Sequence, residues 1–129
     1  MRILFEPKTN ELEIEASGKE LSDLAVFLQD ETGTRYDNVS VARHANEAYS
    51  KCLSRIMVDR VEGQSVRLSV QADECLVITG DARKIAVLAA NIASGARMPA
   101  GEHTHIDFYP GHLWLAEDSY PLVVSKTRE

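Results

Sequence analysis

The sequence Glu11-Leu-Glu-Ile-Glu-Ala16, followed at once by Ser17-Gly-Lys-Glu20, decides how the first part of the chain folds. Apolar residues alternate with glutamates over residues 11–16, which predicts a β-strand with one buried face. Ser17 and Glu20 then have the spacing of a capping box, and the apolar residues change to helical spacing. We therefore predict a strand over residues 11–16 and a helix over residues 18–29.

The segments on both sides of this stretch are also strand-like. Residues 2–5 predict a short strand that forms a hairpin with residues 11–16. Further along the chain, apolar runs begin at Leu53, Val66 and Cys75 and are separated by turn residues. We predict that these three runs form an antiparallel meander, with the last and most apolar of them as a central strand.

The remaining segments complete the predicted order of elements. Residues 34–52 carry the weakest pattern, and within them residues 45–52 fit either a short helix or an ordered loop. A second helix is predicted to begin after the cap residue Asp81 and to end at Gly95. Two final strands are expected, one over residues 103–109 and one over residues 122–124. The core face of the second helix is predicted to consist of Ile85, Leu88, Ala89 and Ile92.

These elements predict an α+β fold in a single domain spanning residues 1–129. Its sheet is mostly antiparallel, and both helices pack on one face of it as a two-layer sandwich. A chain of this length buries enough surface to fold without metals or disulfides. We expect Cys52 and Cys75 to be reduced thiols in a cytoplasmic protein, because the sequence shows neither a disulfide framework nor a signal peptide nor a membrane span.

The charge of the chain is acidic and unevenly distributed. There are 14 basic and 20 acidic residues, which gives a net charge of -6. Such a balance argues against a nucleic-acid binder, because phosphate contacts need clustered Lys and Arg. Residues 1–38 hold four basic and nine acidic residues, a net of -5. Glu11, Glu13 and Glu15 share one face of their strand, which is either a solvated face or a surface that attracts a basic partner.

A cluster of histidines lies near the C-terminal end. His103, His105 and Asp107 share one face of their predicted strand, and His112 follows after a turn at Pro110 and Gly111. Three imidazoles and a carboxylate are a candidate zinc or iron ligand set. The same residues also fit a solvent-facing strip or a contact with a partner. Because the spacing is weakly specific, we expect a metal-free protein without a cofactor.

An aromatic loop follows the histidines, over residues 109–121. It holds Tyr109, His112 and Trp114, the one Trp of the chain, beside acidic residues. Aromatic side chains next to charged ones on a loop are typical of a protein-binding patch. Alternatively, Trp114 and its neighbour Leu115 close the edge of the sheet. The chain contains none of the common nucleotide-binding, hydrolase or zinc-protease motifs.

The C-terminal half resembles the immunity protein 32 family of bacterial polymorphic toxin systems, from about Leu53 to Val124. The segments that carry this resemblance are Leu53-Ser-Arg-Ile56, Val66-Arg-Leu-Ser-Val70, Leu76-Val-Ile-Thr-Gly80, Gly101-Glu-His-Thr-His-Ile-Asp107, Tyr109-Pro-Gly-His112 and Leu115-Ala-Glu-Asp-Ser-Tyr-Pro-Leu-Val123. The resemblance implies a small α+β cytosolic protein that binds and neutralises a toxin encoded beside it. It places His103, His105, Tyr109, His112, Asp118 and Ser119 at motif positions of the family, either as toxin contacts or as residues that hold the fold.

The sequence therefore supports three functional hypotheses. The first is an immunity protein that occludes a cognate toxin stoichiometrically and has no enzymatic activity. A toxin that attacks nucleic acid would offer a basic cleft, which an acidic inhibitor complements. The alternatives are a small metal-dependent enzyme that uses the histidine cluster, and a non-catalytic regulatory module. The residues expected to contact the partner are Glu11, Glu13, Glu15, His103, His105, Asp107, Tyr109, His112, Trp114, Asp118 and Ser119.

Overall fold

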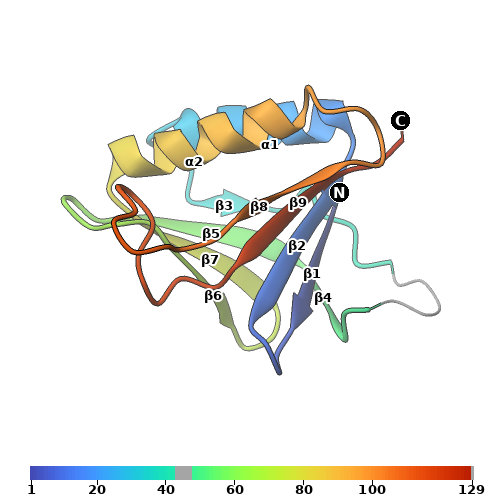
Figure 1. The fold of residues 1–129 in the computed structure, drawn as a ribbon, viewed down its shortest axis with the longest axis horizontal. Helices are drawn as coiled ribbons and strands as arrows, with labels where there is room; N and C mark the ends of the chain where they lie inside the picture. Colours follow the sequence, from blue (N-terminus) through green and yellow to red (C-terminus); the bar gives the residue numbers. More distant parts are fainter. Residues whose placement is uncertain (43–47, 129) are drawn as a thin grey trace.

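The computed structural model describes residues 1–42 and 48–128. Two helices lie side by side across one face of a layer of strands (Figure 1). The helices are α1 (Gly18–Gln29) and α2 (Ala82–Gly95). The strands are β1 (Arg2–Glu6), β2 (Glu11–Ala16), β3 (Arg35–Tyr36), β4 (Lys51–Leu53), β5 (Arg55–Arg60), β6 (Arg67–Gln71), β7 (Cys75–Gly80), β8 (His103–Ile106) and β9 (Leu122–Lys126).

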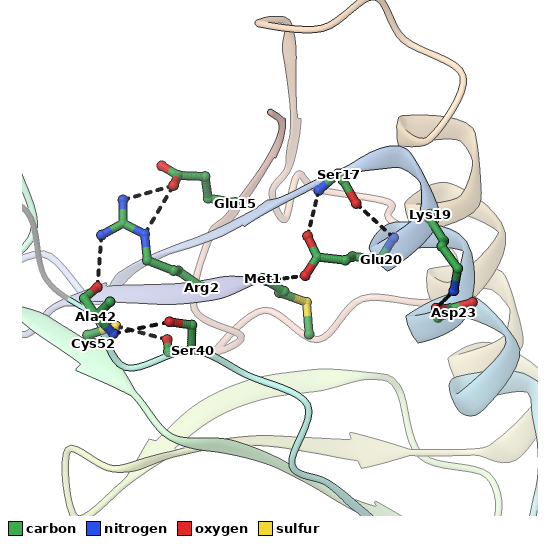
Figure 2. Close-up of polar contacts among 10 residues, drawn as sticks. All are labelled: Met1, Arg2, Glu15, Ser17, Lys19, Glu20, Asp23, Ser40, Ala42 and Cys52. Carbon is green, nitrogen blue, oxygen red and sulfur yellow. Dashed lines mark hydrogen bonds and ion pairs between the residues drawn. The ribbon is translucent and has the colours of Figure 1, made fainter. Parts of the chain in front are cut away.

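Both helices begin where the sequence predicts. The Ser17 hydroxyl accepts a hydrogen bond from the Glu20 N–H at 3.2 Å, and the Glu20 carboxylate accepts one from the Ser17 N–H at 2.9 Å. This capping box fixes the first turn of α1, as Figure 2 shows. At the start of α2, the Asp81 carboxylate accepts a hydrogen bond from the Arg83 N–H at 2.9 Å. The predicted span of residues 18–29 for α1 is confirmed.

The strands form two sheets where we expected one. In the first the order is β4-β1-β2-β9-β8, and in the second it is β3-β5-β7-β6. Among the described residues, five of the strand pairings are antiparallel and two are parallel, namely β2 with β9 and β5 with β7. The predicted α+β class and the mostly antiparallel character are therefore confirmed, but the sheets are mixed.

The predicted meander of three antiparallel strands is wrong in its pairing. β7 is indeed central, but it lies between β5 and β6 and runs parallel to β5. The chain therefore passes from β5 to β6 at the edge of the sheet, and β7 then lies between these two strands. Hydrophobic alternation could not reveal this, because it specifies which face of a strand is buried and not which strand lies beside it.

Part of the weakly patterned stretch joins the two sheets. Its described residues include the short strands β3 and β4, and β4 is followed after Ser54 by β5 in the other sheet. The Ser54 N–H donates to the Glu74 carbonyl at 2.8 Å, which holds the chain at this change of sheet. Of the predicted helix or loop at residues 45–52, residues 45–47 lie outside the described residues, and Lys51 and Cys52 form part of β4.

The hydrophobic core lies between the helices and the sheets. Each predicted core residue of α2 is fully buried, and the inward residues of β2 and β9 pack against the same cluster. Cys52 is a half-buried free thiol and Cys75 a buried one. Among the described residues, none of the helices has the length and apolar character needed to cross a membrane. The fully buried core residues of α2 are Ile85, Leu88, Ala89 and Ile92.

We predict that Leu88→Ala lowers the free energy of unfolding by about 2–5 kcal/mol, the usual effect of removing a buried leucine side chain. The control is Val87→Ala on the same helix, because Val87 is 39% exposed. That change should alter the free energy of unfolding by less than about 0.5 kcal/mol. Urea unfolding measures both, and equal effects of the two substitutions would contradict the assigned core face.

Candidate functional site

The parallel pairing of β2 with β9 brings two predicted site clusters onto one surface. Across the five-stranded sheet, Glu13 is in register with Val123, and Val123 with His105. One row further along, Glu15 is in register with Ser125, and Ser125 with His103. The opposite face carries the buried residues that pack under the helices. We call the outward surface the Glu–His face, and it consists of Arg2, Leu4, Glu11, Glu13, Glu15, His103, His105, Val123 and Ser125.

The histidines form the open end of the Glu–His face. His103 and His105 are both exposed, and their rings meet edge to face with centroids 5.2 Å apart. Asp107 follows directly after β8, is exposed, and has the same strand parity. These side chains pack on each other or face water, so they are free to contact a partner.

The glutamates form the other end of this face and are half-buried rather than fully solvated. The Arg2 guanidinium donates to Oε1 of Glu15 at 2.8 and 3.1 Å, and also to the Ala42 carbonyl at 3.2 Å (Figure 2). The Tyr49 hydroxyl donates to Oε1 of Glu11 at 2.5 Å. These contacts reduce the repulsion between the three carboxylates and order them. The prediction of a row of glutamates on one face is confirmed, but that row is partly paired within the chain.

Tyr49 is the main cover over the glutamates. Together with Ala48 it closes one side of a hollow of about 220 Å³, whose opposite wall contains Leu4 and Glu13. Burial raises the pKa of Tyr49 above its ordinary value of 10.0, and its hydrogen bond to the Glu11 carboxylate raises it further. The neutral hydroxyl is therefore held in place as a donor at neutral pH.

The aromatic loop is organised by His112. Its Nδ1 accepts hydrogen bonds from the N–H groups of Leu115 at 3.0 Å and Trp114 at 3.3 Å. Its ring lies 4.5 Å from that of Tyr109 and 4.8 Å from that of Trp114, between centroids. Trp114 is half-buried, whereas Leu113 is 87% exposed. The large apolar side chains that this loop presents to solvent are therefore Leu113 and Tyr109, and not mainly the predicted anchor Trp114.

The segment after the loop seals the edge of the second sheet. The Val66 N–H donates to the Trp114 carbonyl at 2.7 Å, and the Ala116 N–H to the Val66 carbonyl at 2.8 Å. The Ser119 hydroxyl accepts a hydrogen bond from the Leu68 N–H at 2.9 Å. Leu115 is buried, so the expectation that this part of the chain closes a sheet edge is confirmed for it.

Asp118 lies on the outer side of the same segment. Its carboxylate forms an ion pair with Arg67 of β6 at 3.2 Å, and it is 69% exposed. Apart from Asp118, the positions named from the resemblance fall into two groups. His112 and Ser119 hold the backbone of the fold. His103, His105 and Tyr109 are exposed and face solvent.

The proposed set of metal ligands is not assembled in the structure. His103 and His105 are neighbours, but the ring of His112 packs among Phe108, Tyr109 and Trp114, and its Nδ1 is occupied by backbone N–H groups. Over residues 1–42 and 48–128, no group of three His, Cys, Asp or Glu side chains is placed to hold a metal ion.

Two residues of the Glu–His face, and Tyr49 that covers part of it, were not predicted from the sequence as site residues. Val123 is central to it, yet its apolar character indicated only a buried strand. The role of Arg2 could have been expected from the sequence, because a basic residue in the first strand of a hairpin can face a glutamate of the second strand. Tyr49 carried no such signal, since it comes from the weakly patterned stretch and reaches Glu11 across 38 residues of sequence.

The comparisons with known proteins bear on the second half of the chain. The family model described as Immunity protein 32 matches residues 76–127, which run from β7 to the end of β9. This match confirms the predicted resemblance from residue 76 onward, and the family's name supports an immunity function. Residues 53–75, which we included in the resemblance, lie outside the match. Searches of curated proteins and of solved structures returned no match to the chain.

We predict that Tyr49→Phe lowers the free energy of unfolding by about 1 kcal/mol at neutral pH, the typical net value of one hydrogen bond. The folded pKa of Tyr49 is raised, so this stabilisation is complete below the ordinary tyrosine pKa and is lost as the pH rises through the folded value. The pKa of Tyr49 is obtained by subtracting the alkaline absorbance titration of the Tyr49→Phe variant from that of the wild-type protein. A Tyr49 step at or below 10.0 would show that Glu11 does not hold the hydroxyl.

A second prediction concerns His112. His112→Ala removes the acceptor of two backbone N–H groups and should lower the free energy of unfolding by about 1–3 kcal/mol. His112→Asn supplies an acceptor oxygen close to the position of Nδ1 and should recover a large part of the loss. Thermal and urea unfolding compare the three proteins. If the Ala and Asn variants are equally unstable, ring packing rather than the Nδ1 acceptor holds the loop.

Proposed function

We propose that this protein is an immunity protein, which binds a protein toxin encoded beside it and blocks it stoichiometrically without turnover. The Glu–His face receives the toxin. The single observation that supports this most is the placement of the glutamates of β2 and the histidines of β8 on one surface through β9. The family match supports the same class of function.

The shape and charge of this surface suit occlusion of a partner. Five hydrogen-bonded strands form a stiff platform, and Arg2 and Tyr49 hold two of its glutamates in fixed positions. Ordered carboxylates lose little side-chain freedom on binding, so they can complement a basic patch at low entropic cost. The partner we propose is therefore a toxin with a basic active-site cleft, and both proteins meet in the cytoplasm.

Apolar contacts complete the proposed interface. The loop that follows Asp107 exposes Tyr109 and Leu113, and exposed aromatic and aliphatic side chains beside a charged surface are typical anchors of protein interfaces. Trp114 supports this loop from the half-buried side. In this proposal binding needs neither a cofactor nor a metal ion, and no catalytic residue is assigned.

The function is tested by expressing the neighbouring gene product together with this protein. We expect the pair to co-purify in a one-to-one complex, and we expect cells to survive toxin expression only when this protein is present. A neighbouring product that is toxic, stays unbound and is not neutralised would contradict the proposal. Protection that requires far less than one equivalent of this protein would instead indicate turnover.

We predict that Glu13→Gln slows association with the toxin about two- to fivefold at low salt, since one charge on a protein surface contributes up to about 1 kcal/mol. The effect should fade as salt shortens the Debye length. The matched control is Asp73→Asn, which removes the same charge in the turn between β6 and β7. Asn tolerates the positive φ of 51° at that position. Stopped-flow association rates compare the variants, and equal rates for both would remove the Glu–His face from the encounter surface.

A further inference from the structure

β8 is an edge strand whose outer backbone groups are free. It pairs with β9 on one side and has no partner strand on the other among the described residues. The Lys126 N–H donates to the Glu102 carbonyl at 3.0 Å, and the Lys126 carbonyl accepts from the Gly101 N–H at 2.7 Å, so the Glu102 carbonyl points toward β9. Hydrogen-bonded pairs alternate along an antiparallel ladder. Thr104 and Ile106 therefore bond to β9, and the N–H and C=O groups of His103 and His105 point off the edge.

Nothing in the described part of the chain uses these four backbone groups. Outside the ladder with β9, no hydrogen bond reaches the backbone of His103 or His105, and both residues are exposed. By contrast, the edge of β6 is covered by the segment that carries Trp114 and Ala116. Edge strands of soluble proteins are commonly protected by Lys, Pro or a bulge. β8 (His103–Ile106) contains neither Lys nor Pro and keeps a regular register with β9. A bulge comes directly before it, where Gly101 and Glu102 both bond to Lys126.

A groove runs beside this free edge. Figure 1 shows β8 passing below α2, and a hollow of about 170 Å³ lies between them. Asn91, Ser94 and Met98 line it on the side of the helix, and Thr104, His105 and Ile106 line it on the side of the strand. An extended segment placed along β8 would have one row of side chains against this groove and the other row beside His103 and His105 on the Glu–His face.

We propose that β8 binds an extended segment of the toxin by strand addition, so that the segment becomes a sixth strand of the first sheet. The proposal rests on the proposed immunity function and names the contact through which it operates. The added strand carries small apolar residues toward Met98 and basic residues on the outer side. Strand addition supplies affinity through main-chain hydrogen bonds, while the alternate side chains supply specificity.

Charge favours a basic toxin segment over a second copy of this chain. Glu102 and Asp107 flank the two ends of β8, and both are exposed. A second copy would bring the same residues, 102–107, which include no Lys or Arg to pair with these carboxylates. Basic side chains of a toxin segment at these positions would form ion pairs with them.

Two variants at one position separate the backbone contact from the side-chain contact. His105→Pro removes the outward N–H without removing a hydrogen bond to β9, and proline is tolerated on an edge strand. His105→Ala removes the same imidazole and keeps the N–H. We expect the Pro variant to bind the toxin about tenfold more weakly than the Ala variant, because it leaves one partner carbonyl in the interface without a donor. Thermal unfolding of both variants checks that they are folded.

Amide hydrogen exchange measured by NMR on the wild-type protein gives a second readout that needs no variant. In the free protein the amides of His103 and His105 should exchange fast, and those of Thr104 and Ile106 slowly. In the toxin complex all four should exchange slowly. A complex that forms while His103 and His105 still exchange fast would overturn strand addition and leave the immunity function standing. Equal affinities of the folded His105→Pro and His105→Ala variants for the toxin would also overturn strand addition without contradicting the immunity function. A toxin that does not bind the wild-type protein would contradict the proposed function itself.

Discussion

The parallel pairing of β9 with β2 is the interaction on which the rest of the structure depends. It places the last strand of the chain between the N-terminal hairpin and β8, in the interior of the first sheet. Ile14 and Val124 lie in register and are both fully buried beneath the helices. Without this pairing the sheet would separate into the hairpin with β4 on one side and β8 on the other. The Glu–His face would not exist, because its two halves meet only across β9.

This arrangement explains why neighbouring residues of the C-terminal part of the chain have two different kinds of role. Within the matched region, His112 and Ser119 bond to backbone N–H groups, so they fix the course of the chain between β8 and β9. That course delivers β9 to its place beside β2. His103 and His105 face solvent on the resulting surface and make no comparable contact with the fold. The first pair therefore builds the surface, and the second pair is available for a partner.

Sequence reasoning succeeded where the determining interactions are local. The hairpin, the capping box at Ser17 and the core face of α2 depend on residues a few positions apart, and the structure confirms them. It failed for the order of β5, β6 and β7 and did not foresee two sheets, since strand partners are chosen by packing across long separations. The two halves of the candidate site were each found by strand parity. The sequence did not predict that the two halves form one surface, because this depends on which strand lies between them.

Tyr49 is another residue whose contribution to the site could not be predicted from the sequence pattern. No periodic pattern surrounds it, yet its hydroxyl orders Glu11 and the residue helps to cover the glutamate end of the Glu–His face. Arg2 acts in a similar way on Glu15. Both residues turn a row of repelling carboxylates into an ordered surface. A sequence pattern could indicate the charges of this face and the pairing of Arg2, but the hydrogen bond from Tyr49 became visible only in three dimensions.

The central claim is that the surface created by the pairing of β2 with β9 is the one that meets the toxin. Cross-saturation NMR of the labelled protein bound to unlabelled toxin tests this claim most directly. The account predicts that saturation transfers to Glu13, Val123 and His105, which lie in one row across three strands. Transfer confined to the outer side of the helices, around Val26 and Arg97, with this row unaffected, would contradict it.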